Sequence, residues 1–321
     1  MRAWFSSGVF PASQLPLYYA FGGVLVLLIV ASVVSLAMKR ARPGKNYTEL
    51  RQRVRTWWWI AAIFGVALCL HPKGAIILMA VVSFLAFKEY LSLLATRRAD
   101  HVVLLWAYLA IPLQYFWVWQ DWYGMFIIFI PVYLFLFLPM RMAMVGETRG
   151  FLHAAGTLHW GMMTTVFSLS HIAFLVNLPD LHGPRPLTGG MYVFYLLLLT
   201  QLNDVAQYIW GKCLGRHKVI PKVSPNKTVE GLVGGVLTTT LLAWLLAPWF
   251  TPFTPIQAVL VGLMIGVAGF IGDVVMSAVK RDIGVKDASS MLPGHGGILD
   301  RLDSLSYTAP LFFHVLYYLH Y

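Results

Sequence analysis

Long apolar stretches alternate with short polar connections along almost the whole chain. The stretches, of roughly 14 to 25 residues each, cover about 17–38, 57–70, 74–96, 101–119, 122–138, 157–177, 191–211, 228–247, 256–279 and 305–319. A helix needs about 20 apolar residues to cross the hydrocarbon core of a bilayer. The pattern therefore predicts an all-α, polytopic integral membrane protein with about nine to ten transmembrane helices. The stretch 57–70 is the weakest, because it is short for a full crossing.

Composition supports this fold class. Of the 321 residues, 59% are hydrophobic and only 12% are charged, and the mean hydropathy is +0.70. These values lie outside the range of an ordinary soluble domain. The net charge of +11 would otherwise suggest a nucleic-acid partner, but its distribution gives a different explanation.

The basic residues fall on one side of the predicted topology. All but four of the 24 Lys and Arg residues lie in the loops after the first, third, fifth, seventh and ninth spans. The exceptions are Arg2, Lys73 and Arg185, on the other side, and Lys88, within a span. Since cytoplasmic loops are enriched in Lys and Arg, both chain ends are predicted to face outward. We expect contacts with membrane lipids, no nucleic-acid partner, and a multi-pass protein of a bacterial inner membrane with a retained first helix.

One basic segment stands beside a tryptophan run. The arginines of 51–55 precede Trp57, Trp58 and Trp59. Basic residues followed by interfacial aromatics are typical of a juxtamembrane anchor, and that is the interpretation favoured here.

Acidic residues divide the chain into two parts. Seven of the 13 Asp and Glu residues lie from Asp204 onward. We therefore predict N-terminal transmembrane helices over 1–190 and a C-terminal part, 191–321, that carries the chemistry on the cytoplasmic face.

A first polar cluster ends the seventh predicted span. Asn203, Asp204 and Gln207 are three to four residues apart and share one helix face. An Asp inside a span costs about 2.5 kcal/mol or more to insert, so Asp204 is a candidate functional residue. The alternative is an interfacial Asp204 held by Lys212 or Lys227.

A second cluster follows in the sequence SPNKT of 224–228. Ser224 and Pro225 have the residue types of a helix cap and first helical position, which predicts a helix start there. The free N–H groups of that helix start, with Lys227, would suit a phosphate. Glycine pairs four residues apart, at 231 and 235 and at 262 and 266, predict close helix packing.

The third cluster is the most charged of the three. Asp273, Ser277 and Lys280 recur at positions i, i+4 and i+7 on one helix stripe, and Asp300 and Asp303 return after a glycine-rich loop. Carboxylates without cysteine favour Mg²⁺, which leaves coordination positions for substrate phosphates. Matching cations are supplied by Lys280, Arg281, Lys286 and Arg301. The cluster predicts a metal and nucleoside triphosphate site that opens onto lipid.

The third cluster resembles a known signature. Its ordered residues are Ser277, Lys280, Arg281, Lys286, Asp287, Ser289, Leu292, Pro293, His295, Gly296, Gly297, Asp300, Arg301 and Asp303. This pattern is similar to that of the phosphatidate cytidylyltransferases, also called CDP-diacylglycerol synthases. SPNKTVEG at 224–231 and the block from Asn203 to Gly215 resemble the upstream motifs of that family. The similarity covers about 200–310, whereas the first half resembles the family only in its apolar spans.

The resemblance implies an Mg²⁺-dependent enzyme, usually a homodimer, that joins CTP to phosphatidic acid and gives CDP-diacylglycerol and pyrophosphate. It implies metal carboxylates at Asp273 and Asp300, with Asp303 close by, and a possible second cation. The residues implied to hold the substrates are Ser224, Lys227, Asn203, Asp204, Lys280, Arg281, Lys286, Asp287, His295 and Arg301. Catalysis would fall to Asp273, Asp300, Lys280 and Arg281.

Two departures from the family pattern leave the lipid substrate open. Gln207 stands within the first block, and Ala288-Ser289-Ser290 replaces the more usual Phe-Gly after Asp287. A paralogue that cytidylylates another lipid phosphate therefore stays an alternative. Two further alternatives are a CTP-dependent lipid kinase and a cation-coupled carrier with Asp204 and Asp273 as ion sites.

Overall fold

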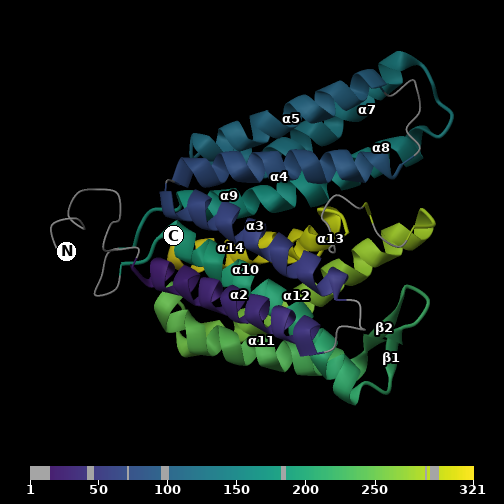
Figure 1. The fold of residues 1–321 in the computed structure, drawn as a ribbon. Helices are drawn as coiled ribbons and strands as arrows, with labels where there is room; N and C mark the ends of the chain where they lie inside the picture. The colour runs from purple at the N-terminus through teal and green to yellow at the C-terminus, as the bar shows by residue number, and fades with distance from the viewer. Residues whose placement is uncertain are drawn as a thin grey trace.

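The structure of this chain is a computed structural model, and it describes residues 15–41, 47–70, 72–94, 101–181, 186–285, 288–289 and 296–321. Helices dominate these residues and run side by side as a bundle, with one small β-hairpin at its edge (Figure 1). Six of the helices are long and apolar enough to cross a membrane. The prediction of an all-α, polytopic membrane protein is confirmed. The number of crossings and the orientation stay predictions.

The first four described helices form two antiparallel pairs. They are α2 (Leu15–Ala41), α3 (Thr48–Leu70), α4 (Pro72–Ser92) and α5 (His101–Trp119). The expected short span 57–70 is wrong in length, since α3 begins at Thr48 and includes the basic segment 51–55. Arginines are good helix formers, so a charged first half does not end the helix where the apolar run ends.

The next two helical segments are each interrupted by a π-helical turn. The first segment consists of α6 (Tyr123–Ile128), η3 (Phe129–Leu134) and α7 (Phe135–Val145), and the second of α8 (Phe151–Met162), η4 (Met163–Phe167) and α9 (Ser168–Asn177). Pro131 lies within η3 and has no N–H for the helical ladder. In η4, Thr165 donates its hydroxyl to the carbonyl of Gly161 at 2.7 Å.

The C-terminal part carries the hairpin and the longest described helix, α12 (Pro255–Asp282). Its elements are α10 (Gly189–Leu214), β1 (Lys218–Ile220), β2 (Ser224–Thr228), α11 (Val229–Phe250), α12, α13 (Leu299–Leu302) and α14 (Leu305–His320). Strands β1 and β2 pair antiparallel, with Lys218 opposite Thr228. The hairpin and α13 lie at the same end of the bundle, and the C-terminus lies at the other end (Figure 1).

The predicted helix start at Ser224 is wrong. Ser224 and Pro225 belong to β2, and α11 begins four residues later with Thr228 as its cap. The Thr228 hydroxyl accepts the N–H of Gly231 at 3.2 Å. Proline suits the edge of a sheet as well as a first helical turn, so Ser-Pro alone does not distinguish the two.

The predicted packing role of the glycine pairs is confirmed. A Cβ at Gly235 would overlap the Gln207 side chain of α10, and one at Gly262 would lie 2.7 Å from the Cα of Thr240 on α11. The small residues therefore let α10, α11 and α12 approach backbone to backbone, as in other membrane bundles. This close packing brings the polar ends of these helices together.

Candidate active site at the hairpin end of the bundle

Three elements converge around Lys227. This lysine stands at the end of β2, and its Nζ lies 2.5 Å from Asp273 Oδ2 of α12 and 3.1 Å from Gln207 Oε1 of α10. Its charge also acts on Asp204, one turn earlier on α10. The side chains of Lys227 and Asp273 are 20% and 23% exposed, so this ion pair can still be reached from outside.

The α10 cluster supports the site in two different ways. Asn203 is fully buried, donates to the carbonyl of Gly266 at 3.2 Å and accepts the Thr239 hydroxyl at 3.0 Å. It therefore fastens α10 to α11 and α12. Asp204 accepts the Ser304 hydroxyl at 3.2 Å on both carboxylate oxygens, so it joins α10 to the turn before α14.

A buried ion pair joins α13 to α12. Lys280 Nζ lies 2.6 Å from Asp300 Oδ1, with the two side chains 11% and 9% exposed. Asp300 Oδ2 accepts the N–H groups of Ala288 at 3.0 Å and Gly297 at 2.9 Å. Both carboxylate oxygens of Asp300 therefore already have hydrogen-bond partners within the protein. Its implied role as a metal ligand stays a prediction.

A carboxylate from the N-terminal half reaches the same loop. Glu89 of α4 is 3% exposed, and its Oε2 accepts the N–H groups of Ile298 at 2.7 Å and Leu299 at 3.3 Å. A Cβ at Gly297 would collide with the end of this carboxylate, so a larger residue there would displace the Glu89 side chain from its present position. Glu89 therefore caps the backbone that leads into α13, and it does so from a distant part of the sequence.

Asp303 completes the cluster of carboxylates. It is 8% exposed, and its Oδ1 accepts only the N–H of Ser304, at 2.7 Å, among the contacts of the described residues. Burial, together with the nearby charges of Asp273 and Asp204, raises the pKa of Asp303 well above its usual range. Three carboxylates that repel one another in a buried setting are a favourable environment for a cation.

These residues fit a Mg²⁺ that shares its coordination with a substrate. No group of three or more His, Cys, Asp or Glu side chains among the described residues is arranged to hold a metal without help. Mg²⁺ is usually held by one or two protein carboxylates together with waters and substrate phosphates. Asp303 and Asp273 would provide that number of ligands. Only Oδ1 of Asp303 is engaged among the described contacts. Asp273 would have to exchange a present contact for the metal, because its Oδ2 pairs with Lys227 and its Oδ1 accepts the Ser277 hydroxyl at 3.3 Å.

The remaining predicted site residues are placed less centrally. Arg281 is exposed and donates to the carbonyl of Val223 on the hairpin at 3.4 Å. Ser224 is half-buried on β2, and the charge of Arg301 acts on Asp204. The predicted residues Lys286, Asp287 and His295 lie outside the described residues.

Sequence reasoning missed Glu89 and the helix-cap role of Thr228. The rule that singled out Asp204, a carboxylate inside an apolar span, also applies to Glu89 and would have found it. No local pattern indicates its contact with Ile298, because the two residues are 209 positions apart. Thr228 was included with the phosphate cluster, but its cap role depends on a helix start that the sequence pattern misplaced.

Comparison with known proteins gives the class. The family model described as the cytidylyltransferase family matches residues 51–319. The chain therefore belongs to the cytidylyltransferase family and is a nucleotidyltransferase of the membrane. The resemblance noted in the sequence is confirmed at the level of the family.

Individual relatives fall into two groups. The chain is 44% identical over 297 residues to the uncharacterized protein YnbB of Escherichia coli (strain K12), covering 92% of this chain and 96% of that protein. It is 39% identical over 155 residues to the phosphatidate cytidylyltransferase of Staphylococcus aureus (strain COL), covering 47% of this chain and 59% of that enzyme. The enzyme of Staphylococcus haemolyticus (strain JCSC1435) is 37% identical over the same length. The likeness to named enzymes thus spans less than two thirds of their length.

Proposed function

We propose that this protein transfers the cytidylyl group of CTP to phosphatidic acid and releases pyrophosphate, with Mg²⁺ as its cofactor. The observation that carries the proposal is the convergence of Lys227, Asp273 and Asp303 beside the loop held by Lys280 and Asp300. Family membership and the partial likeness to phosphatidate cytidylyltransferases support the same reaction.

In the proposed reaction, a phosphate oxygen of the lipid attacks the α-phosphorus of CTP, and the bond from that phosphorus to the β-phosphate oxygen breaks. The lipid phosphate is already an anion at neutral pH, so positioning and charge neutralisation are the main requirements. Lys227 is placed to exchange its contact with Asp273 for a phosphate oxygen. The Lys280–Asp300 pair and Glu89 keep the loop backbone in position for the triphosphate.

Mg²⁺, when bound, would neutralise charge on the phosphates and favour pyrophosphate as a leaving group. Asp273 and Asp303 would hold it, and Asp300 would support it by fixing the loop through Lys280, Ala288 and Gly297. A second cation stays a prediction. The proposed substrate contacts of Ser224, Asn203, Arg281 and Arg301 would then be indirect or peripheral.

A paralogue with a different lipid phosphate as acceptor is the second candidate. The observation that favours it is Gln207, which is 4% exposed, accepts Lys227 and leaves its buried Nε2 without a partner among the described contacts. The buried Nε2 of Gln207, next to the proposed phosphate site, is available to donate a hydrogen bond to a polar group of a lipid headgroup and so to distinguish one headgroup from another. The extensive likeness to YnbB, whose description assigns no substrate, fits either candidate.

The position of a label in CTP tests the reaction class. With purified protein, Mg²⁺ and phosphatidic acid, transfer predicts that label from the α-phosphate enters the lipid and label from the γ-phosphate leaves as pyrophosphate. A lipid kinase would move the γ-label to the lipid, and a cation carrier would move neither. Either of these results would remove the proposal.

The proposed setting is a bacterial inner membrane, with the hairpin end of the bundle on the cytoplasmic side and the protein as a homodimer. The cytoplasmic placement rests on the distribution of Lys and Arg. It agrees with the proposed reaction, because CTP is a cytoplasmic nucleotide and the candidate site lies at the hairpin end of the bundle (Figure 1). In this account 191–321 carries the transfer chemistry, and 1–190 supplies apolar helices and the Glu89 contact.

A further inference from the structure

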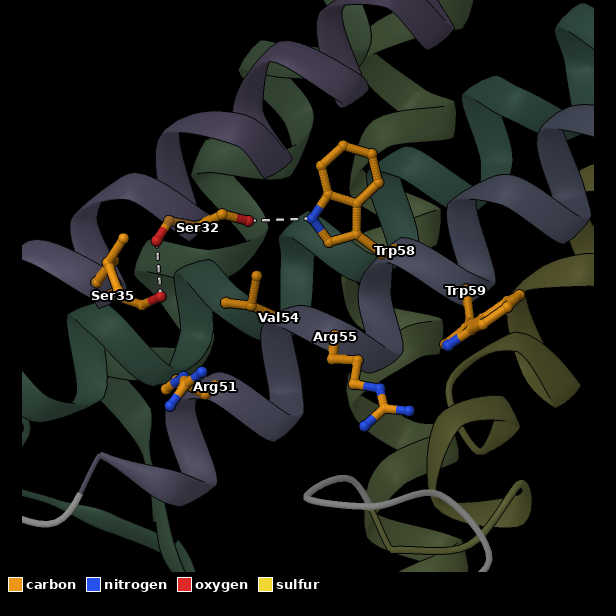
Figure 2. A pocket seen from close by; sticks show the side chains of 8 residues that line it. Ser32, Ser35, Arg51, Val54, Arg55, Trp58 and Trp59 are labelled. Carbon is orange, nitrogen blue, oxygen red and sulfur yellow. Dashed lines mark hydrogen bonds between the residues drawn. The ribbon is translucent and has the colours of Figure 1, made fainter. Parts of the chain in front are cut away.

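A pocket lies away from the candidate active site, between α2 and α3. Its volume is about 350 Å³, and its lining includes Ser32 and Ser35 of α2 and Arg51, Arg55 and Trp58 of α3 (Figure 2). Arg51 and Arg55 are exposed, and their i, i+4 spacing places both residues on one face of α3, with Val54 between them in Figure 2. The sequence pattern alone indicated no more than an anchor here.

The wall of the pocket is held in place by hydrogen bonds. The indole N–H of Trp58 donates to Ser32 Oγ at 3.0 Å, and this hydroxyl donates to the carbonyl of Leu28 at 2.7 Å. Ser35 is buried and donates to the carbonyl of Ser32 at 2.9 Å. The Trp58–Ser32 bond joins α3 to α2, so the wall of the pocket beside the two arginines is already formed before a ligand binds.

The location of the pocket favours a lipid. In Figure 1 the start of α3 and the end of α2 lie toward the hairpin end of the bundle, the end that carries the candidate site. Trp59, also in the lining, is 62% exposed, as expected of an aromatic residue at a membrane interface. A guanidinium group can donate two parallel N–H hydrogen bonds to two oxygens of one phosphate. The aliphatic side chains of Leu36 and Val54, which also line the pocket, can contact the glycerol part of a lipid.

We propose that this pocket binds the headgroup phosphate of an anionic glycerophospholipid, between Arg51 and Arg55. The shared chemistry is a negatively charged phosphate at the membrane surface. Its source is either a lipid phosphate monoester, such as phosphatidic acid, or a bulk anionic diester, such as phosphatidylglycerol. The inference does not depend on the proposed reaction, because it concerns binding at a separate set of residues.

Lipid retention measured by native mass spectrometry tests the site. The purified full chain is placed in phosphatidylcholine nanodiscs that contain increasing phosphatidylglycerol or phosphatidic acid, at about 0.15 M salt, where exposed charges are screened beyond ~8 Å. The variant Arg51→Gln/Arg55→Gln is compared with Arg40→Gln/Arg53→Gln, which removes the same charge from residues outside the pocket lining. An unfolding temperature in pure phosphatidylcholine checks that both variants fold.

The pocket variant is expected to lose about 150-fold in affinity for anionic lipid, because a charge-assisted hydrogen bond from each arginine to the phosphate contributes roughly 1.5 kcal/mol. The control variant should lose less than about fivefold. Arg51→Lys/Arg55→Lys should keep the charge but lose part of the affinity, since lysine cannot form the paired contact. A loss confined to the pocket variant supports the site. A preference for one lipid then identifies the source of the phosphate, and a similar loss for both means that the pocket binds either headgroup. Equal losses in the two glutamine variants, or retention of phosphatidylcholine at the same strength, would overturn the proposal.

Discussion

Single carboxylates carry the clearest prediction, and Asp273 is the sharpest case. Asp273→Asn removes the charged partner of Lys227, and with it one proposed cation ligand. The rate of CDP-lipid formation should fall by about a thousandfold, the scale expected when a preorganised electrostatic contact is lost. Asp282→Asn, an exposed residue at the end of the same helix, is the matched control and should change the rate less than about twofold. Unchanged turnover in Asp273→Asn would remove Asp273 from the reaction.

Glu89 is expected to act as a positioning residue. Glu89→Gln keeps the size of the side chain but weakens two hydrogen bonds to Ile298 and Leu299. Each bond to a charged acceptor contributes about 1.5–3 kcal/mol, so turnover should fall by about 10- to 100-fold. Hydrogen exchange at the amides of 297–299 should rise in parallel.

The control for Glu89 is Glu147→Gln. Glu147 is exposed and accepts only a neighbouring N–H, that of Arg149, among its described contacts. Turnover and amide exchange should both stay unchanged in that variant. If Glu89→Gln lowers turnover without altering exchange at 297–299, the account of Glu89 as a support for the loop is wrong.

The sequence could predict which residues matter better than what each one contacts. Asp273, Lys280 and Asp300 follow from charge placed at the ends of apolar spans. The pairing of Lys280 with Asp300, 20 positions later, depends on how the loop folds back. Local spacing contains no information on that return, and none on the approach of Glu89 from α4.

Helix packing gives the prediction at the scale of elements. Gly235→Ala and Gly262→Ala would force α11 away from α10 and α12, since each new Cβ meets side chain or backbone atoms. Overpacking of this kind costs about 1–3 kcal/mol, so each variant should unfold at a lower temperature in detergent. Gly156→Ala, on an exposed face of α8 with nothing within 4 Å, is the control and should be neutral or slightly stabilising. Equal stability of all three variants would contradict the close packing.

The elements themselves were predictable wherever hydrophobicity decides them. The bounds expected for the fourth and last spans, 101–119 and 305–319, match α5 and α14 closely. The starts of α3 and α11 were misplaced, because polar residues such as Arg51 or Lys227 are compatible with a helix, a strand or a loop. Caps and strand pairing depend on neighbours in space, and a hydropathy pattern does not contain them.

Orientation is the prediction that belongs to the whole molecule. Cys213 is an exposed free thiol near the end of α10. The chain has two cysteines, so Cys69→Ser leaves Cys213 as the single thiol. The distribution of Lys and Arg places this end of α10 in the cytoplasm. A membrane-impermeant maleimide should therefore label inverted vesicles and leave right-side-out vesicles unlabelled. The reverse pattern would place the hairpin end outside and separate it from CTP.

Reaction with CTP is the most direct test of the central claim, that the hairpin end of this bundle joins a cytidylyl group to a lipid phosphate. The purified protein is incubated in detergent–lipid micelles with Mg²⁺, CTP and phosphatidic acid, and the products are identified by mass and counted. The account predicts CDP-diacylglycerol and pyrophosphate in equal amounts, both lost in Asp273→Asn. Intact binding of Mg²⁺ and CTP without that product would redirect the search to another lipid phosphate. No product with any lipid phosphate would contradict the account.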